Sequence, residues 1–277
     1  MFQLFKNCFK QTNDGIILAT PLIIFLSILG WYLSYATDSV DSIPKLVLAI
    51  ITTLVMASGF FSAWFYMVKK TLKLSNKVFV FDKDRAKAFG ELIMSLPKGI
   101  GKLFLPFLGV ISISSIIYGL IIAGITFLVY KYIGSVNIDL LNSNNLLVSS
   151  KELFEELSQL PREEIIVINC WYMLVLAAIT IVSFFFILWI PEIVYSEKNP
   201  FKALINSLKK IWLTGAKSLL LYIYINVLSF IISILSTLLM FNPISYFLVL
   251  LLYYYFIVYI VVLIFTYYEI TFYKDAQ

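Results

Sequence analysis

Four polar side chains within or at the ends of long apolar segments are the residues of this sequence that could do chemistry. Glu192 and Glu269 lie in LWIPEIVY and FTYYEITF, and Asn169 and Asn226 lie in VINCWYM and YINVLSF. An ionisable group within a membrane span marks a site for an ion, a proton or a substrate, because an unpaired charge is costly in hydrocarbon. Amides at this depth more often join neighbouring helices by hydrogen bonds, although a substrate contact is the alternative.

Three interpretations of the glutamates stay open. Alignment of the inner ends of alternate apolar runs puts Met67, Glu192 and Glu269 at one position, about one turn inside the boundary. A structural ion pair would use a nearby lysine, Lys198 or Lys274 being nearest in sequence. A transport or binding role would require both glutamates and both asparagines to share one water-accessible cavity. Exposure to headgroup water is the third interpretation.

The usual residue combinations of membrane enzymes are missing from the sequence. It has no histidine, which removes the commonest general base and metal ligand. The segment MASGF at 56–60 lacks the first glycine of a G-x-S-x-G motif. Asp82 and Asp84 are flanked by bases, and Cys8 and Cys170 lie in different segments. We therefore expect no catalytic activity, no cofactor, no metal site and no disulfide.

Composition indicates a membrane protein. The 277 residues are 61% hydrophobic and only 13% charged, whereas soluble domains carry roughly 25% charged residues. A helix needs about 20 apolar residues to cross the hydrocarbon. The last uncharged run is too long for one crossing, and Asn242-Pro243 predicts a turn near its middle. The chain is therefore expected to be an all-α integral membrane protein with six transmembrane helices. The uncharged runs are 15–36, 46–68, 103–130, 165–191 and 218–268.

The distribution of charge predicts the orientation. With six spans, the segments on the side of the amino terminus hold 17 of the 21 Lys and Arg residues but only 8 of the 16 acids. Because basic residues favour the cytoplasmic side, we expect a bacterial inner-membrane protein with both termini in the cytoplasm. The basic balance thus reflects topology, and no nucleic-acid partner is expected. The outer loop 131–164 should carry a short amphipathic helix at 150–161.

The sequence also suggests three repeats within a single membrane domain, 1–76, 77–198 and 199–277. Each would consist of an interfacial amphipathic helix followed by a helical hairpin. The amphipathic segments 2–15, 88–101 and 202–215 align without gaps. Each segment ends at a glycine (Gly15, Gly101 or Gly215) directly before a span.

The third amphipathic segment, NPFKALINSLKKIW, has the clearest pattern. Asn199 suits a helix N-cap and Pro200 the first helical position. Its apolar residues fall within one arc, opposite its lysines, so it should lie in the interface. Three roles are open for these helices. They would set the tilt of the span that follows, bind anionic lipid headgroups, or form a docking surface for a partner. The candidate headgroup contacts are Lys6, Lys10, Lys202, Lys209 and Lys210.

Tyrosines are concentrated in the sixth span, with three in a row at 253–255 and Tyr259 one turn further on. A buried hydroxyl group needs a hydrogen-bond partner. These residues either pack among themselves or line a small hydrated, amide-lined cavity between spans four, five and six.

Residues 190–230 carry a recognisable arrangement: Glu192 at the end of a span, the turn Asn199-Pro200, an Ala203-Leu204-x-x-Ser207 helix and Gly215 before a new span. This segment resembles bacterial integral-membrane families related to the membrane domain of glycerophosphoryl diester phosphodiesterase. The resemblance implies a six-span cytoplasmic-membrane protein with cytoplasmic ends. In that family the diester-hydrolysing activity belongs to a separate soluble barrel domain, so the resemblance implies no such activity for these spans.

Together these features predict a polytopic inner-membrane protein without catalytic activity of its own. It would serve as a lipid- or envelope-associated scaffold or as a partner subunit, with membrane lipids, a protein partner or further copies of itself as partners. The alternative is a small-solute or lipid transporter with an inner-facing polar cavity, built around the two glutamates and two asparagines.

Overall fold

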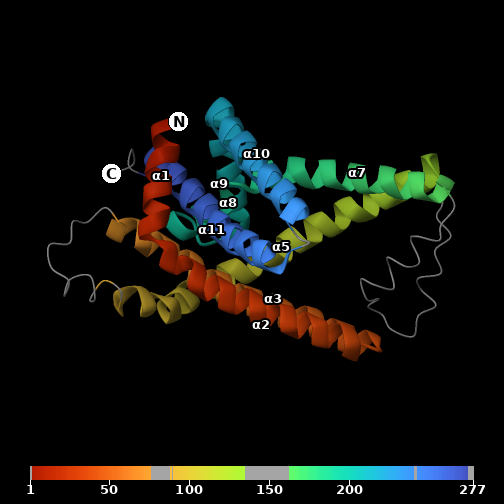
Figure 1. Cartoon of the computed structure of the whole chain (residues 1–277), viewed down its shortest axis with the longest axis horizontal. Helices are drawn as coiled ribbons and strands as arrows, with labels where there is room; N and C mark the ends of the chain where they lie inside the picture. The colour runs from red at the N-terminus through yellow and green to blue at the C-terminus, as the bar shows by residue number, and fades with distance from the viewer. Residues whose placement is uncertain (1, 76–87, 89, 135–161, 240–241, 274–277) are drawn as a thin grey trace. The chain divides into compact units, whose positions relative to one another are not determined.

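The computed structural model describes residues 2–75, 88, 90–134, 162–239 and 242–273, and the regular elements within them are helices (Figure 1). Six of the described stretches are long and apolar enough to cross a membrane. The predicted all-helical class and the predicted number of spans are thereby confirmed. These stretches are Ile16–Ser39, Ile43–Ser75, Gly90–Tyr132, Arg162–Tyr195, Gly215–Leu239 and Ile244–Tyr273.

Several spans are assembled from more than one helical element. A short 3-10 helix, η1, precedes α2, and a short π-helix, η3, continues α11. In chain order the elements are α1 (Phe2–Asp14), η1 (Ile16–Leu18), α2 (Ala19–Ser39), α3 (Ile43–Ser75), α5 (Ser95–Tyr132), α7 (Arg162–Phe186), α8 (Trp189–Tyr195), α9 (Pro200–Leu213), α10 (Gly215–Leu239), α11 (Pro243–Tyr268) and η3 (Glu269–Tyr273).

Two asparagine-proline pairs start helices, where the sequence predicted a helix start at Asn199-Pro200 and a turn at Asn242-Pro243. The Asn199 side chain accepts hydrogen bonds from the backbone amides of Phe201 and Lys202 at 3.0 and 3.1 Å, and Pro200 begins α9. Asn242 caps α11 in the same way, directly before Pro243. Asparagine satisfies amides that have no partner within the helix, and proline lacks an amide where none is needed. The N-cap of α9 and the turn between the last two spans are therefore confirmed.

The second predicted glycine boundary is wrong. Gly15 and Gly215 stand where one helix gives way to the next, but α5 runs through Gly101 without a break. A glycine within a helix costs only about 1 kcal/mol, so it does not by itself end the helix. Gly99 instead has a packing role, because a Cβ atom there would lie 2.8 Å from the Cα atom of Ala63.

The chain divides into two compact units. Unit 1 comprises Met1–Phe25, Ser58–Phe107 and Phe184–Gln277, and unit 2 comprises Leu26–Ala57 and Leu108–Ser183. Large side chains fill the core of unit 1, among them Trp64, Trp189 and Tyr268. In unit 2, the indole of Trp171 donates a 2.9 Å hydrogen bond to Thr126. The sites described below lie within unit 1.

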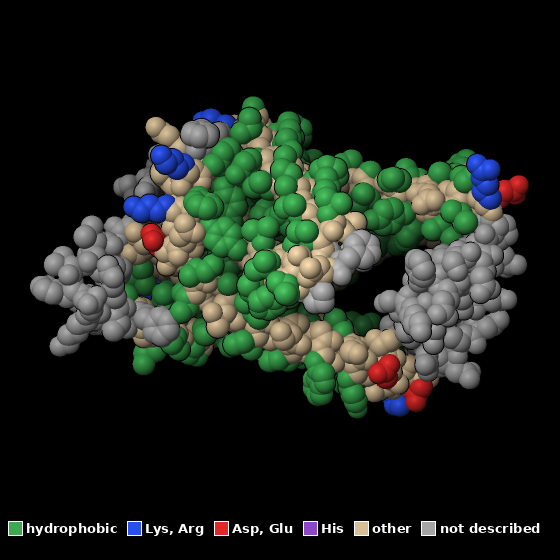
Figure 2. Space-filling view, in the orientation of Figure 1, with side chains coloured by type: hydrophobic (Ala, Val, Ile, Leu, Met, Phe, Trp, Pro, Cys, Tyr) green, Lys and Arg blue, Asp and Glu red, His purple; other side chains and the backbone are tan. Residues whose placement is uncertain are grey.

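Large apolar side chains cover much of the helix surface. Phe230 on α10 is 67% exposed and Trp212 on α9 is 79% exposed. Figure 2 shows hydrophobic side chains over the visible face of α10, with charged side chains lying toward helix ends. Contiguous apolar surface of this extent is typical of contact with hydrocarbon, not with water. The helix predicted at 150–161 and the acids Asp82 and Asp84 lie outside the described residues.

Candidate functional site

A short helix, α8, places Glu192 inside unit 1. The fourth span is interrupted at residues 187 and 188, between α7 and α8. Almost every residue of α8 is buried, and the Trp189 indole ties it to the start of α9 by donating a 2.8 Å hydrogen bond to the Pro200 carbonyl. Because α8 packs against both α9 and α11, side chains from these two helices meet at Glu192.

Glu192 is held by a lysine and a tyrosine from two other helices. Glu192 is only 1% exposed to solvent. Lys210 of α9 donates to Glu192 Oε2 at 2.6 Å, and the Tyr268 hydroxyl of α11 donates to the same oxygen at 2.6 Å. Lys210 also donates to the Tyr268 oxygen at 2.7 Å, and Ser196 Oγ lies 2.9 Å from that oxygen. The carboxylate therefore sits in a closed network of charge-assisted hydrogen bonds.

The cation of this network is also enclosed by aromatic rings. The Lys210 ammonium lies 4.7 Å from the centre of the Tyr268 ring and 5.5 Å from that of Phe272, and its side chain is 23% exposed. Ring faces attract cations, most strongly where water is excluded. Lys210 was expected among the headgroup contacts, but its ammonium lies against Glu192 because the turn at 196–199 folds α9 back over α8.

Glu269 lies beside this network, on the first turn of η3. It accepts a 3.2 Å hydrogen bond from the Tyr195 hydroxyl. The Tyr195 ring stacks on the Tyr268 ring, with centroids 5.6 Å apart. The structure therefore brings the two glutamates together through their tyrosine partners. Single turns of π-helix often occur at functional sites, because they redirect side chains within a helix.

Lys198, one of the two lysines nearest in sequence, is not the partner of Glu192. Glu192 pairs with Lys210, whereas Lys198 is exposed and lines a different pocket. Lys274 lies outside the described residues. Lys210 lies 18 positions after Glu192 on a separate helix, and the turn between α8 and α9 breaks the helical periodicity, so sequence spacing could not identify this pair.

The two asparagines do not join the glutamates. Asn226 of α10 is exposed, and its amide donates a 2.8 Å hydrogen bond to the Tyr222 carbonyl of its own helix. Asn169 is an exposed residue of α7 that belongs to unit 2. The shared polar cavity expected for transport is thus not supported by the contacts of Asn226.

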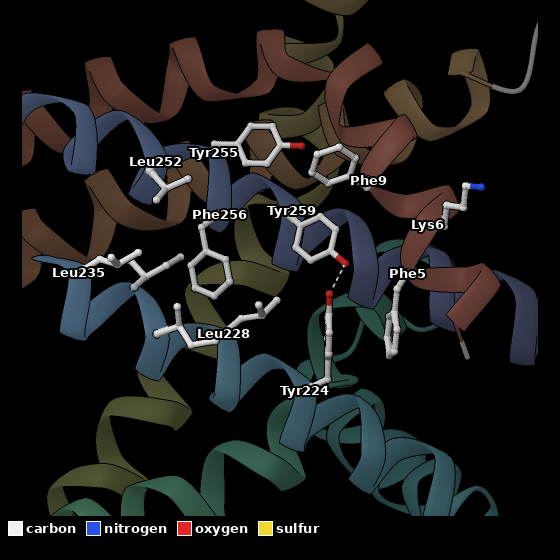
Figure 3. Close-up of a pocket in the computed structure, with 12 residues that line it drawn as sticks. Phe5, Lys6, Phe9, Tyr224, Leu228, Leu235, Leu252, Tyr255, Phe256 and Tyr259 are labelled. Atoms are coloured by element: carbon white, nitrogen blue, oxygen red, sulfur yellow. Dashed lines mark hydrogen bonds between the residues drawn. The ribbon is translucent and has the colours of Figure 1, made fainter.

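A second candidate site is an apolar pocket between α1, α10 and α11, with a volume of about 520 Å³ (Figure 3). The Tyr224 and Tyr259 hydroxyls are 3.0 Å apart and bond to each other, so their polar atoms satisfy one another. Lys6 lies at one end with its ammonium directed away from the rings. The pocket is lined by Phe5, Lys6, Phe9, Tyr224, Leu228, Ile231, Ile232, Leu235, Leu252, Tyr255, Phe256 and Tyr259.

Helix α1 forms one wall of this pocket by packing along α11 (Figure 1). The Phe5 ring stacks on that of Tyr224 at 4.0 Å, and Asn13 Oδ1 accepts a 2.7 Å hydrogen bond from Tyr255. Cys8 of α1 is buried beside Thr266 of α11, and this burial raises the pKa of its thiol to about 11. The sequence pointed to the tyrosines of the sixth span, but not to α1 as the third wall.

The other predicted headgroup lysines are available to solvent or lipid. Lys6 and Lys10 of α1 and Lys202 and Lys209 of α9 are all exposed.

Comparison of the chain with protein-family models, curated proteins and solved structures finds no match. The function must therefore be inferred from the geometry of these sites.

Proposed function

We propose that this chain is a multi-pass protein of a bacterial cytoplasmic membrane that binds an anionic phospholipid and has no catalytic activity of its own. One acyl chain occupies the apolar pocket between α1, α10 and α11, and the headgroup lies beside Lys6. Bound lipid holds α1 against the last two spans. The protein then serves as a lipid-associated scaffold, in keeping with the family that residues 190–230 resemble.

The pocket itself supports this function most directly. Its walls are apolar side chains and tyrosine rings, and its one charged residue, Lys6, stands at one end. The helical stretch from Tyr224 to Leu235 is about 16 Å long at 1.5 Å per residue. This length is close to half of the ~30 Å hydrocarbon thickness, which is the depth of one leaflet. An acyl chain with a negative headgroup therefore matches the pocket in polarity, length and charge.

The excess of basic residues on the amino-terminal side supports an inner-leaflet location for the headgroup. Each lysine near an anionic leaflet contributes about 1 kcal/mol. With both termini in the cytoplasm, Lys6 and Lys10 face that leaflet. Both lysines are exposed on the same helix, but only Lys6 is among the residues that line the pocket, and a test can use this difference.

The contacts of the glutamates favour a structural role for them over transport. The Glu192 carboxylate already has an ammonium and a phenol as partners at 2.6 Å. A group that exchanges ions or substrate needs at least one unoccupied coordination position or a route to water. No described contact of Asn226 adds to such a site. We therefore assign Glu192 to the packing of α8 against α9 and α11.

Photo-crosslinking tests the proposal. The full chain is reconstituted in bilayers that contain a phospholipid with a photoactivatable acyl chain, and adducts are mapped by mass spectrometry. Adducts are expected on α10 and α11 residues of the pocket. Leu228→Trp fills the pocket and should remove them, whereas Val227→Trp changes a neighbouring exposed residue outside the pocket and should leave them.

Lys6→Gln should reduce the preference for anionic over zwitterionic lipid, and Lys10→Gln should not. Adducts that are equally strong in the Leu228→Trp and Val227→Trp proteins would show that the lipid contacts only the outer surface. A pocket occupied by a protein segment instead would give no lipid adduct at all. Either result would remove the proposed function.

A further inference from the structure

A second pocket of unit 1, of about 430 Å³, is lined by five lysines from three segments. Three belong to the last turns of α3, one to α5, and one to the turn between α8 and α9. None of them is among the lysines that the sequence suggested as headgroup contacts. The lining residues are Tyr66, Lys69, Lys70, Lys73, Lys102, Leu103, Ile193, Val194, Tyr195, Ser196 and Lys198.

Positive charge predominates in this pocket. Lys73 and Lys102 act electrostatically on Lys69, so these ammonium groups lie close enough to repel one another. Two described carboxylates act in the opposite sense: Glu91 lies 3.6 Å from Lys70, and Glu269 acts on Lys69. Five lysines against two glutamates leave an excess of three positive charges among the described residues. A bound anion would relieve this repulsion.

Two of the lysines are held in position before any ligand binds. Lys69 donates a 2.7 Å hydrogen bond to the Val194 carbonyl and lies 4.5 Å from the centre of the Tyr195 ring. Lys102 lies 5.5 Å from the centre of the Tyr66 ring. Because these side chains are already ordered, less conformational entropy is lost when a ligand binds. The other three carry less fixed contacts, and Lys73 and Lys198 are exposed.

The turn between α8 and α9 also carries a carboxylate, Glu197, but it does not line the pocket. Glu197 Oε1 accepts a 3.0 Å hydrogen bond from the Asn199 amide and is not part of the pocket lining. The turn therefore contributes Lys198 and Ser196 to the pocket. Tyr195 connects this wall to Glu269, which its hydroxyl contacts at 3.2 Å. The pocket thus adjoins the glutamate network and shares Tyr195 and Ser196 with it.

We propose that this lysine-lined pocket binds an oxyanion of the phosphate class. Lysine binds phosphate as a point charge, and several converging ammonium groups can serve several oxygens at once. The volume of the pocket falls within the usual range for small-molecule sites. The same chemistry has two sources, the headgroup of a phospholipid and a free phosphate or phosphoester in the cytoplasm. This site is separate from the apolar pocket and does not depend on the function proposed above.

Two binding measurements on the full chain distinguish these sources. In neutral detergent, the protein is titrated with inorganic phosphate by calorimetry. In nanodiscs of zwitterionic lipid, increasing fractions of phosphatidylglycerol are added and bound lipid is counted by native mass spectrometry. Each measurement uses the unaltered protein, the pocket variant Lys73→Gln/Lys102→Gln/Lys198→Gln, and a control. The control, Lys98→Gln/Lys131→Gln/Lys217→Gln, removes the same charge from exposed positions outside the pocket that are not among the candidate headgroup contacts.

The pocket variant is expected to bind about tenfold more weakly or worse, and the control to change by less than about twofold. A selective loss with inorganic phosphate assigns the site to a free oxyanion, and a selective loss confined to phosphatidylglycerol assigns it to a headgroup. If neither measurement separates the two variants, binding follows total charge or does not occur, and the proposal is overturned.

Two further controls keep the outcome interpretable. The replaced residues are exposed, so both triple variants should unfold at the temperature of the unaltered protein in the same detergent. Leu228→Trp, which blocks the apolar pocket, should leave binding to the lysine pocket unchanged. The two proposals can therefore fail independently.

Discussion

Lys210 on α9 donates a 2.6 Å hydrogen bond to the buried carboxylate of Glu192 on α8, 18 residues earlier in the chain. Tyr268 of α11 donates to the same oxygen. Three helices are thus joined at one oxygen atom. Between helices that lie in hydrocarbon, hydrophobic burial distinguishes poorly between alternative packing arrangements. This relationship leads to the first of four predictions.

Replacing Lys210 by Met should destabilise the protein by about 3–5 kcal/mol, because the Glu192 carboxylate would remain buried without its cation. Lys209→Met is the matched control, since Lys209 is its exposed neighbour on α9. The measurement is the unfolding temperature in detergent. The double variant Lys210→Met/Glu192→Gln should recover much of the loss. Equal unfolding temperatures for the two single variants would show that the ion pair contributes nothing to stability.

Gly99→Ala should be destabilising and Gly101→Ala should not. A Cβ atom at Gly99 would lie 2.8 Å from the Ala63 Cα atom and 2.8 Å from the Ser62 carbonyl oxygen, which are backbone atoms that cannot move aside cheaply. At Gly101 it would meet nothing within 4 Å. The Gly101→Ala protein should gain up to about 1 kcal/mol in helix propensity. Thermal unfolding and monodispersity of both variants test the packing of α5 on α3.

Cys8 should react slowly with maleimides in the folded protein. Burial raises the pKa of its thiol to about 11, and the thiolate is the reactive form. At pH 9, two units below that value, only about 1% is ionised, so the rate should keep rising with pH toward 11. The measurement is the labelling rate in a Cys170→Ser background.

A cysteine at Lys10, exposed on the same helix, provides the control in a protein that lacks both native cysteines. It should label rapidly at neutral pH. A Cys8 rate equal to that of the Lys10 position would mean that α1 is not seated against α11 in solution.

The orientation can be tested by labelling intact cells. A cysteine at Asn144 should react with an impermeant maleimide added outside, and a cysteine at Lys77 should react only after the cells are opened. The expectation follows from the excess of Lys and Arg on the amino-terminal side. Reversed labelling would place both termini outside, and it would move Lys6 and the proposed lipid headgroup to the other leaflet.

The features that could be predicted from sequence are local ones. The six spans follow from runs of apolar residues, because a helix satisfies its own backbone groups wherever it crosses hydrocarbon. The starts of α9 and α11 follow from Asn199-Pro200 and Asn242-Pro243, since a cap is completed by amides two and three residues away. The error at Gly101 is also local in origin. The cost of a glycine within a helix is only about 1 kcal/mol, and α5 continues through Gly101.

Tertiary structure alone decided the sites. Glu192 could have paired with Lys198, but the turn before α9 carries Lys210 to it and leaves Lys198 to join four lysines of α3 and α5. Likewise, α1 closes the apolar pocket through rings that meet residues more than two hundred positions away. Lipid tails are as apolar as the side chains of these helices, so hydropathy indicates that a segment lies in the membrane without indicating which of its faces packs. The faces are chosen by close packing and by a few buried hydrogen bonds, and both depend on residues that are distant in the chain.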